Sequence, residues 1–146
     1  MRLLGISSRK EWLEELSDVC GQIKLLKFKG CSTIEEAEAY YKNSQVDSVV
    51  IMCESYDMRS FLYLERLCAI RDELPVIMIT DNVNNELYFG AVQVRVADII
   101  VGEYDAEILD AALDKVVYSS RRTTYKLCHE YINDSSHAML LGEIAG

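Results

Sequence analysis

The sequence predicts an α/β fold in which five parallel strands alternate with five helices. Five short apolar runs have the length and composition of strands, at residues 2–6, 24–29, 49–53, 75–80 and 97–101. In the segments between them, apolar residues recur at three- and four-residue steps, as they do along one side of an amphipathic helix. Because right-handed crossovers between parallel strands place helices on both faces of a sheet, we expect a three-layer sandwich.

The first two strand runs are each followed by a helix-start signal. A capping box, in which a hydroxyl residue and a later glutamate bond the free amides of a helix start, is predicted at Ser8-x-x-Glu11 and at Ser32-x-x-Glu35. We therefore expect a first helix that begins near Arg9 and a second that begins directly after Ser32.

The next three units continue the alternation. The run at 49–53 is apolar throughout, which is typical of a central strand covered on both faces. A third helix is expected over residues 58–72, and the run that begins at Pro75 resembles another buried strand. Residues 81–93 are the least regular, because their asparagines favour either a loop or a late helix cap. Asp105 is the expected cap of the last helix.

The composition is that of one globular domain. Of the 146 residues, 50% are hydrophobic and 27% are charged, and no apolar run approaches the ~20 residues of a membrane-spanning helix. The first residues also lack the apolar core of a secretion signal. The five cysteines contain no C-x-x-C pair, so we expect buried thiols rather than disulfides or metal ligands, and a cytoplasmic location.

The charge excludes one class of partner. The chain has a formal net charge of −9, all of it within residues 1–118, which disfavours direct binding of nucleic acid by this domain. Its seven glycines form no phosphate-binding loop, which argues against a nucleotide site.

Three stretches together resemble a known family. They are STIEEAEAYYKNSQVDSVVIM, LPVIMIT and VADIIVGEYDAEILDAALDKV, and they are similar to the second helix and third strand, the fourth strand, and the fifth strand and last helix of the response-regulator receiver domain, the CheY-like domain of two-component signalling. The resemblance covers residues 1–118. It implies a flavodoxin-like (βα)5 fold with strand order 2-1-3-4-5.

The resemblance also implies a phosphorylation chemistry. In receivers, two acidic residues after the first strand help to hold Mg²⁺, an aspartate that ends the third strand accepts the phosphoryl group, a threonine or serine ends the fourth, and a lysine ends the fifth. The carboxylates supply hard oxygen ligands, and the metal neutralises the transferred charge.

Most of these positions have lost the required chemistry. In chain order the corresponding residues are Ser7, Ser8, Met52 or Cys53, Thr80 and Gly102. Only Thr80 keeps the family's residue type. Ile99 occupies the aromatic switch position, and Glu103 replaces the proline that commonly follows the lysine. The resemblance therefore implies an atypical receiver, or pseudo-receiver, that is not an enzyme and binds no metal or cofactor.

Two alternatives remain open. A pocket at the carboxyl ends of the strands would serve an enzyme or a sensor of a small molecule or metal, with the lining Ser7, Ser8, Cys53, Glu54 and Thr80. In the other alternative, Glu54 or Asp57 takes the phosphoryl group or a cation in a shifted register. The plain interpretation is that Ser8 caps a helix, Thr80 is a strand-end hydroxyl, and Cys53 lacks an activating base.

Residues 119–146 are expected to extend the last helix, as a linker toward an output domain or as a dimerisation segment. Their apolar residues predict an exposed side that a partner covers. We expect a homodimer, or docking to a fused output domain or partner protein, with this candidate surface: Ile99, Tyr104, Ile108, Tyr125 and Tyr131.

Overall fold

In the computed structural model, five parallel strands form one sheet in the order β2-β1-β3-β4-β5, as the sequence predicts. The structure describes residues 1–54, 59–70, 74–93 and 95–118. The strands are β1 (Arg2–Ile6), β2 (Lys27–Cys31), β3 (Ser48–Cys53), β4 (Val76–Thr80) and β5 (Asp98–Val101). The helices are α1 (Lys10–Cys20), α2 (Ile34–Asn43), α3 (Arg59–Ile70), α4 (Asn85–Gln93) and α5 (Ala106–Tyr118).

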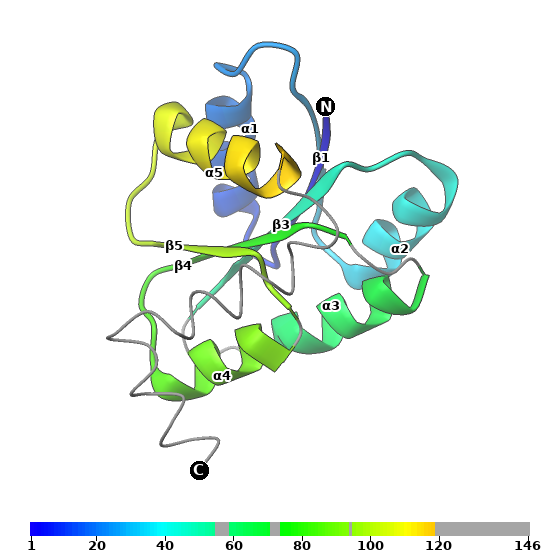
Figure 1. Cartoon of the computed structure of the whole chain (residues 1–146). Coiled ribbons are helices and arrows are strands. Elements are labelled where there is room, and N and C mark those ends of the chain that lie inside the picture. Colours follow the sequence, from blue (N-terminus) through cyan, green and yellow to red (C-terminus); the bar gives the residue numbers. More distant parts are fainter. Residues whose placement is uncertain (55–58, 71–73, 94, 119–146) are drawn as a thin grey trace.

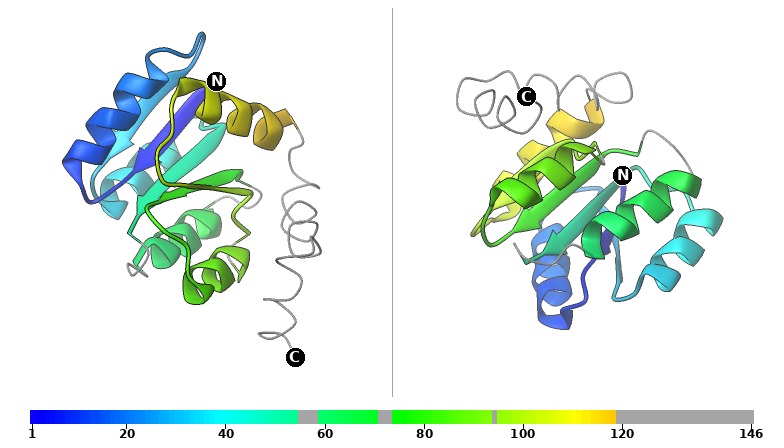
Figure 2. Two further views of the ribbon diagram at one scale, coloured as in Figure 1. Left: turned by 90° about the vertical axis from the view of Figure 1, so that its left-hand side faces the viewer. Right: turned by 90° about the horizontal axis from the view of Figure 1, so that it is seen from below.

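The helices lie in two layers (Figures 1 and 2). One face of the sheet is covered by α1 and α5, whose residues Leu16 and Leu109 pack in one apolar cluster with Val50 and Ile77 of the sheet. The other face is covered by α2, α3 and α4, which pack on a second cluster. Successive side chains of a strand point to opposite faces, so each apolar strand contributes side chains to both clusters.

The central strand β3 pairs with both β1 and β4, and these pairings place the ends of the three strands side by side. All six of its residues are buried, as expected for a strand covered on both faces. It pairs with β1, where Ile6 lies opposite Ile51, and with β4, where Cys53 lies opposite Thr80. The carboxyl ends of these three strands therefore meet at one edge of the sheet.

Two helix caps agree with the predictions from the sequence. The amide of Ile108 donates to Oδ1 of Asp105 over 2.9 Å at the start of α5. For the uncertain segment, the late cap is confirmed, because the amide of Leu87 donates to Oδ1 of Asn84 over 2.8 Å and α4 follows.

The two predicted capping boxes are wrong in their positions. The cap of α2 is Thr33, whose Oγ1 accepts from the amide of Glu36 over 3.2 Å, one residue after the predicted Ser32. The helix α1 has Arg9 in the cap position and no side-chain cap bond. The amide of Arg9 instead donates to Oγ of Ser7 over 3.1 Å. Ser7 is itself held beside the end of β2, since its amide donates to the carbonyl of Cys31.

The second strand begins three residues later than predicted. Residues 21–26 form a turn in which Leu25 has a φ of 63° and is 91% exposed. Such a conformation is unfavourable in a strand, so the apolar run is interrupted and pairing starts at Lys27, opposite Arg2.

The structure also bears on the thiols and on membrane-spanning helices. Within the described residues, no disulfide joins Cys20, Cys31, Cys53 or Cys68. No helix in the described part of the chain is long and apolar enough to cross a membrane.

Candidate functional site

The carboxyl edge of the sheet holds the residues that the sequence singled out. Ser7 follows β1 and is buried, whereas Ser8 is exposed. Met52 and Cys53 end β3 and are both buried. The receiver-like positions on β1 and β3 are thus neighbours in space, but they supply hydroxyl and sulfur groups rather than carboxylates.

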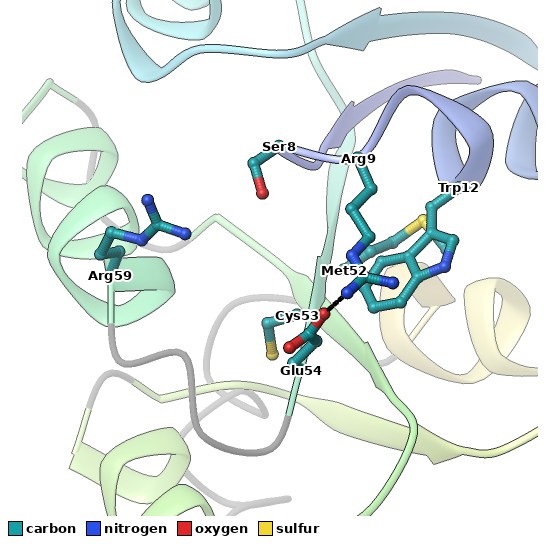
Figure 3. Close-up of a pocket in the computed structure, with 7 residues that line it drawn as sticks. All are labelled: Ser8, Arg9, Trp12, Met52, Cys53, Glu54 and Arg59. Atoms are coloured by element: carbon teal, nitrogen blue, oxygen red, sulfur yellow. Dashed lines mark ion pairs between the residues drawn. The ribbon is translucent and has the colours of Figure 1, made fainter.

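A cavity of about 430 Å³ opens beside these positions (Figure 3). It is formed by the β1–α1 junction, the end of β3 and the start of α3, and its lining residues are Ser8, Arg9, Trp12, Met52, Cys53, Glu54 and Arg59. Volumes of this size accommodate small molecules.

The cavity has arginines on two sides. The guanidinium of Arg9 forms an ion pair with the carboxylate of Glu54 and lies 4.7 Å from the ring centroid of Trp12. Arg59, the first residue of α3, extends toward the same space from the opposite side (Figure 3). The side chains of Arg9 and Glu54 are 52% and 42% exposed, so solvent screens their attraction.

Sequence reasoning did not identify Arg9, Trp12 or Arg59 as site residues. Arg9 directly follows the two serines at the acid-pair positions, and this was the signal in the sequence. Trp12 and Arg59 lie on helices that cover opposite faces of the sheet, and they come near Cys53 because both helices start beside the end of β3.

A second hollow, of about 250 Å³, lies on the α5 side of Trp12 and Met52. Its other lining residues are Glu15, Ile79, Thr80, Asp81, Gly102, Glu103 and Tyr104. The amide of Gly102 donates to the carbonyl of Thr80 over 2.8 Å, and Gly102 has a φ of 81° that favours glycine. The Thr80 hydroxyl donates to the carbonyl of Asn82 over 3.1 Å, so it serves the local turn.

The described residues contain no group of three or more His, Cys, Asp or Glu side chains arranged to hold a metal ion. Glu54 is engaged with Arg9. Asp57, which the sequence paired with Glu54, lies outside the described residues.

The candidate interaction residues divide into three kinds. Ile108 is 44% exposed on α5. Ile99 is partly buried against the cluster under α2, α3 and α4. Tyr104 packs in the cluster under α1 and α5, and its buried hydroxyl has no hydrogen-bond partner; burial and the nearby Glu15 and Cys20 raise the pKa of that hydroxyl. Tyr125 and Tyr131 lie outside the described residues.

No protein-family model matches the chain, and no curated protein matches it. Solved structures do. The signal receiver domain of an HD domain-containing protein from Pseudomonas fluorescens Pf-5 superposes with a TM-score of 0.71 at 16% identity, over 81% of this chain and 94% of that one. A CheY-like response regulator receiver domain from Methanospirillum hungatei JF-1 gives 0.68 at 15%, over 81% and 94%.

The chain has the receiver-domain fold. A third similar structure is an atypical orphan response regulator with a phosphorylation-independent regulatory mechanism, at a TM-score of 0.66 and 18% identity over 81% of this chain and 96% of that one. At these identities the likeness concerns the fold, and the cavity at the carboxyl edge occupies the end of the sheet where doubly wound α/β folds bind ligands.

Proposed function

We propose that this receiver-fold domain is a signal-transduction module that acts through protein contacts and without phosphorylation of an aspartate. The observation that carries the proposal is the chemistry at the end of β3, where the buried side chains are those of Met52 and Cys53. Neither a thioether nor a thiol forms an acyl phosphate. Ser7 and Ser8 likewise provide no carboxylates for Mg²⁺.

The electrostatics support the same conclusion. The carboxylate beside the end of β3, that of Glu54, is paired with Arg9. A guanidinium beside this position disfavours a divalent cation, and phosphoryl transfer depends on that cation to neutralise charge. The atypical orphan regulator of similar fold is an example of phosphorylation-independent regulation on this scaffold.

Beryllofluoride with Mg²⁺, a mimic of the phosphoryl group, tests the proposal. We expect no saturable change that requires Mg²⁺, either in the fluorescence of Trp12, which borders the site, or in the amide spectrum. A saturable change that appears only with Mg²⁺ would contradict the proposal. Its loss in Glu54→Gln or Asp57→Asn would then assign a shifted acceptor.

The partner surface is centred on α5. The exposed apolar side chains of Val101 and Ile108 belong to a segment with one exposed lysine, Lys115, and five exposed carboxylates, those of Glu103, Asp105, Glu107, Asp110 and Asp114. Two such acidic surfaces repel each other, so a partner with basic residues around an apolar contact is favoured over a second copy at this face.

Oligomeric state tests this partner assignment and the dimerisation role predicted for residues 119–146. We expect the chain truncated after Tyr118 to sediment as a monomer. A dimer of the full chain would assign dimerisation to residues 119–146, whereas monomers in both cases would contradict a homodimer. A dimer of the truncated chain that Ile108→Glu dissociates would contradict the basic-partner assignment.

A further inference from the structure

Two arginines border the cavity beside Cys53, in a chain of formal net charge −9. Among the described residues, the charged lining of the cavity consists of these arginines and Glu54, which pairs with Arg9. The arginines come from different elements, Arg9 at the start of α1 and Arg59 at the start of α3, and extend from opposite sides of the space (Figure 3).

We infer that this cavity binds the oxyanion group, carboxylate or phosphate, of a small organic molecule. Guanidinium groups present several N–H donors in a plane that matches such oxyanions, and a carboxylate or phosphate between two of them forms charge-assisted hydrogen bonds to each. The exposed Ser8 at the rim provides a further donor.

The remainder of the lining indicates the rest of the ligand. Trp12 and Met52 form an apolar wall next to the arginines, and both also border the second hollow. A flat indole and a flexible thioether suit an apolar or ring-containing body. The ligand class is therefore a small organic anion rather than an inorganic ion alone.

Glu54 occupies the position of the ligand's oxyanion in the unliganded protein. Its carboxylate pairs with Arg9, and both side chains are about half exposed. A screened pair of this kind is readily exchanged, so an incoming carboxylate or phosphate replaces Glu54 on Arg9.

Trp12 provides a direct readout, because it is the only tryptophan of the chain and Arg9 lies 4.7 Å from its ring. The full chain is titrated with inorganic phosphate and, separately, with benzoate, each against potassium chloride at equal ionic strength. We expect a saturable fluorescence change with both, since both carry the oxyanion, and tighter binding of benzoate because its ring contacts the apolar wall.

Three variants locate the site. Arg9→Gln and Arg59→Gln should each weaken binding by at least about tenfold, which is the effect of losing one charge-assisted bond. Glu54→Gln should strengthen it about threefold, because the competing carboxylate is gone. Arg2→Gln is the control, since Arg2 is an exposed arginine at the opposite end of β1 and its loss should leave binding unchanged.

If a variant does not fold, the site is located in the unaltered chain by following amide chemical shifts during the same titrations. The amides that shift must then include those of residues 8–12 and 53–54. A linear response that potassium chloride reproduces would overturn the proposal. Equal affinity in the Arg2 and Arg59 variants would do so as well. Neither inorganic phosphate nor benzoate phosphorylates a carboxylate, so these outcomes are independent of the beryllofluoride result.

Discussion

Arg9 and Glu54 form an ion pair that joins the start of α1 to the end of β3. The pair lies at the edge of the sheet where receivers hold their metal and phosphoryl group. It therefore places a guanidinium at this edge, beside Met52 and Cys53.

The ion pair should contribute little to stability. Because both side chains are about half exposed, a double-mutant cycle with Arg9→Gln and Glu54→Gln should give a coupling free energy below about 1 kcal/mol. Urea denaturation at low and high salt measures it, and the coupling should fall as salt increases. A coupling well above this value, insensitive to salt, would show that the pair is a structural element rather than an exchangeable one.

The contact between Gly5 and Phe28 predicts a packing defect. A Cβ added at Gly5 would lie 2.5 Å from Cε1 of Phe28 and 3.0 Å from Cδ2 of Leu16, so Gly5→Ala should destabilise the domain by about 1–3 kcal/mol. Gly21→Ala is the matched control, because its φ of −62° is helical and its nearest neighbour would be 3.4 Å away. Thermal unfolding compares them. Equal melting temperatures would contradict the packing of Phe28 over β1.

Helix α5 should tolerate substitution on one side only. Leu109 is fully buried and Ile108 is 44% exposed. Leu109→Ala is expected to cost about 2–5 kcal/mol, whereas Ile108→Ala should cost less than about 1 kcal/mol. Urea unfolding measures both. A larger loss for Ile108 would mean that its side chain is buried, for example in a dimer.

Stability should decline in alkaline solution. Burial raises the pKa of the Cys20 thiol from 9.0 to about 12 and, with Glu36, that of Cys31 to about 11. Between pH 9 and these values the unfolded chain has lost thiol protons that the folded chain keeps, so the free energy of unfolding falls as pH rises, by up to about 1.4 kcal/mol per pH unit for each thiol.

Urea titrations at pH 8, 9.5 and 10.5 measure this decline. Cys20→Ala is the comparison, because the variant lacks one of the two thiols and should lose less stability over the same interval. An identical decline in the variant and the unaltered chain would show that Cys20 does not contribute.

The sequence predicted the sheet more fully than the site. Apolar runs and helical stripes determine the number and order of elements, because those patterns reflect burial of whole segments. The start of β2 escaped prediction because Leu25 is an apolar residue in a left-handed turn. The cavity was not predicted because Arg9 and Arg59 stand at the starts of helices on opposite faces of the sheet, and no local sequence pattern shows that both helices start beside the end of β3.

Acetyl phosphate tests the central claim most directly. The full chain is incubated with it and Mg²⁺, alongside a receiver that keeps the acid pair, acceptor aspartate and lysine, and intact masses are measured. We predict the addition of one phosphoryl group to that receiver and none to this chain, because Met52 and Cys53 end β3. A phosphoryl group on this chain, removed by Glu54→Gln or Asp57→Asn, would contradict the account.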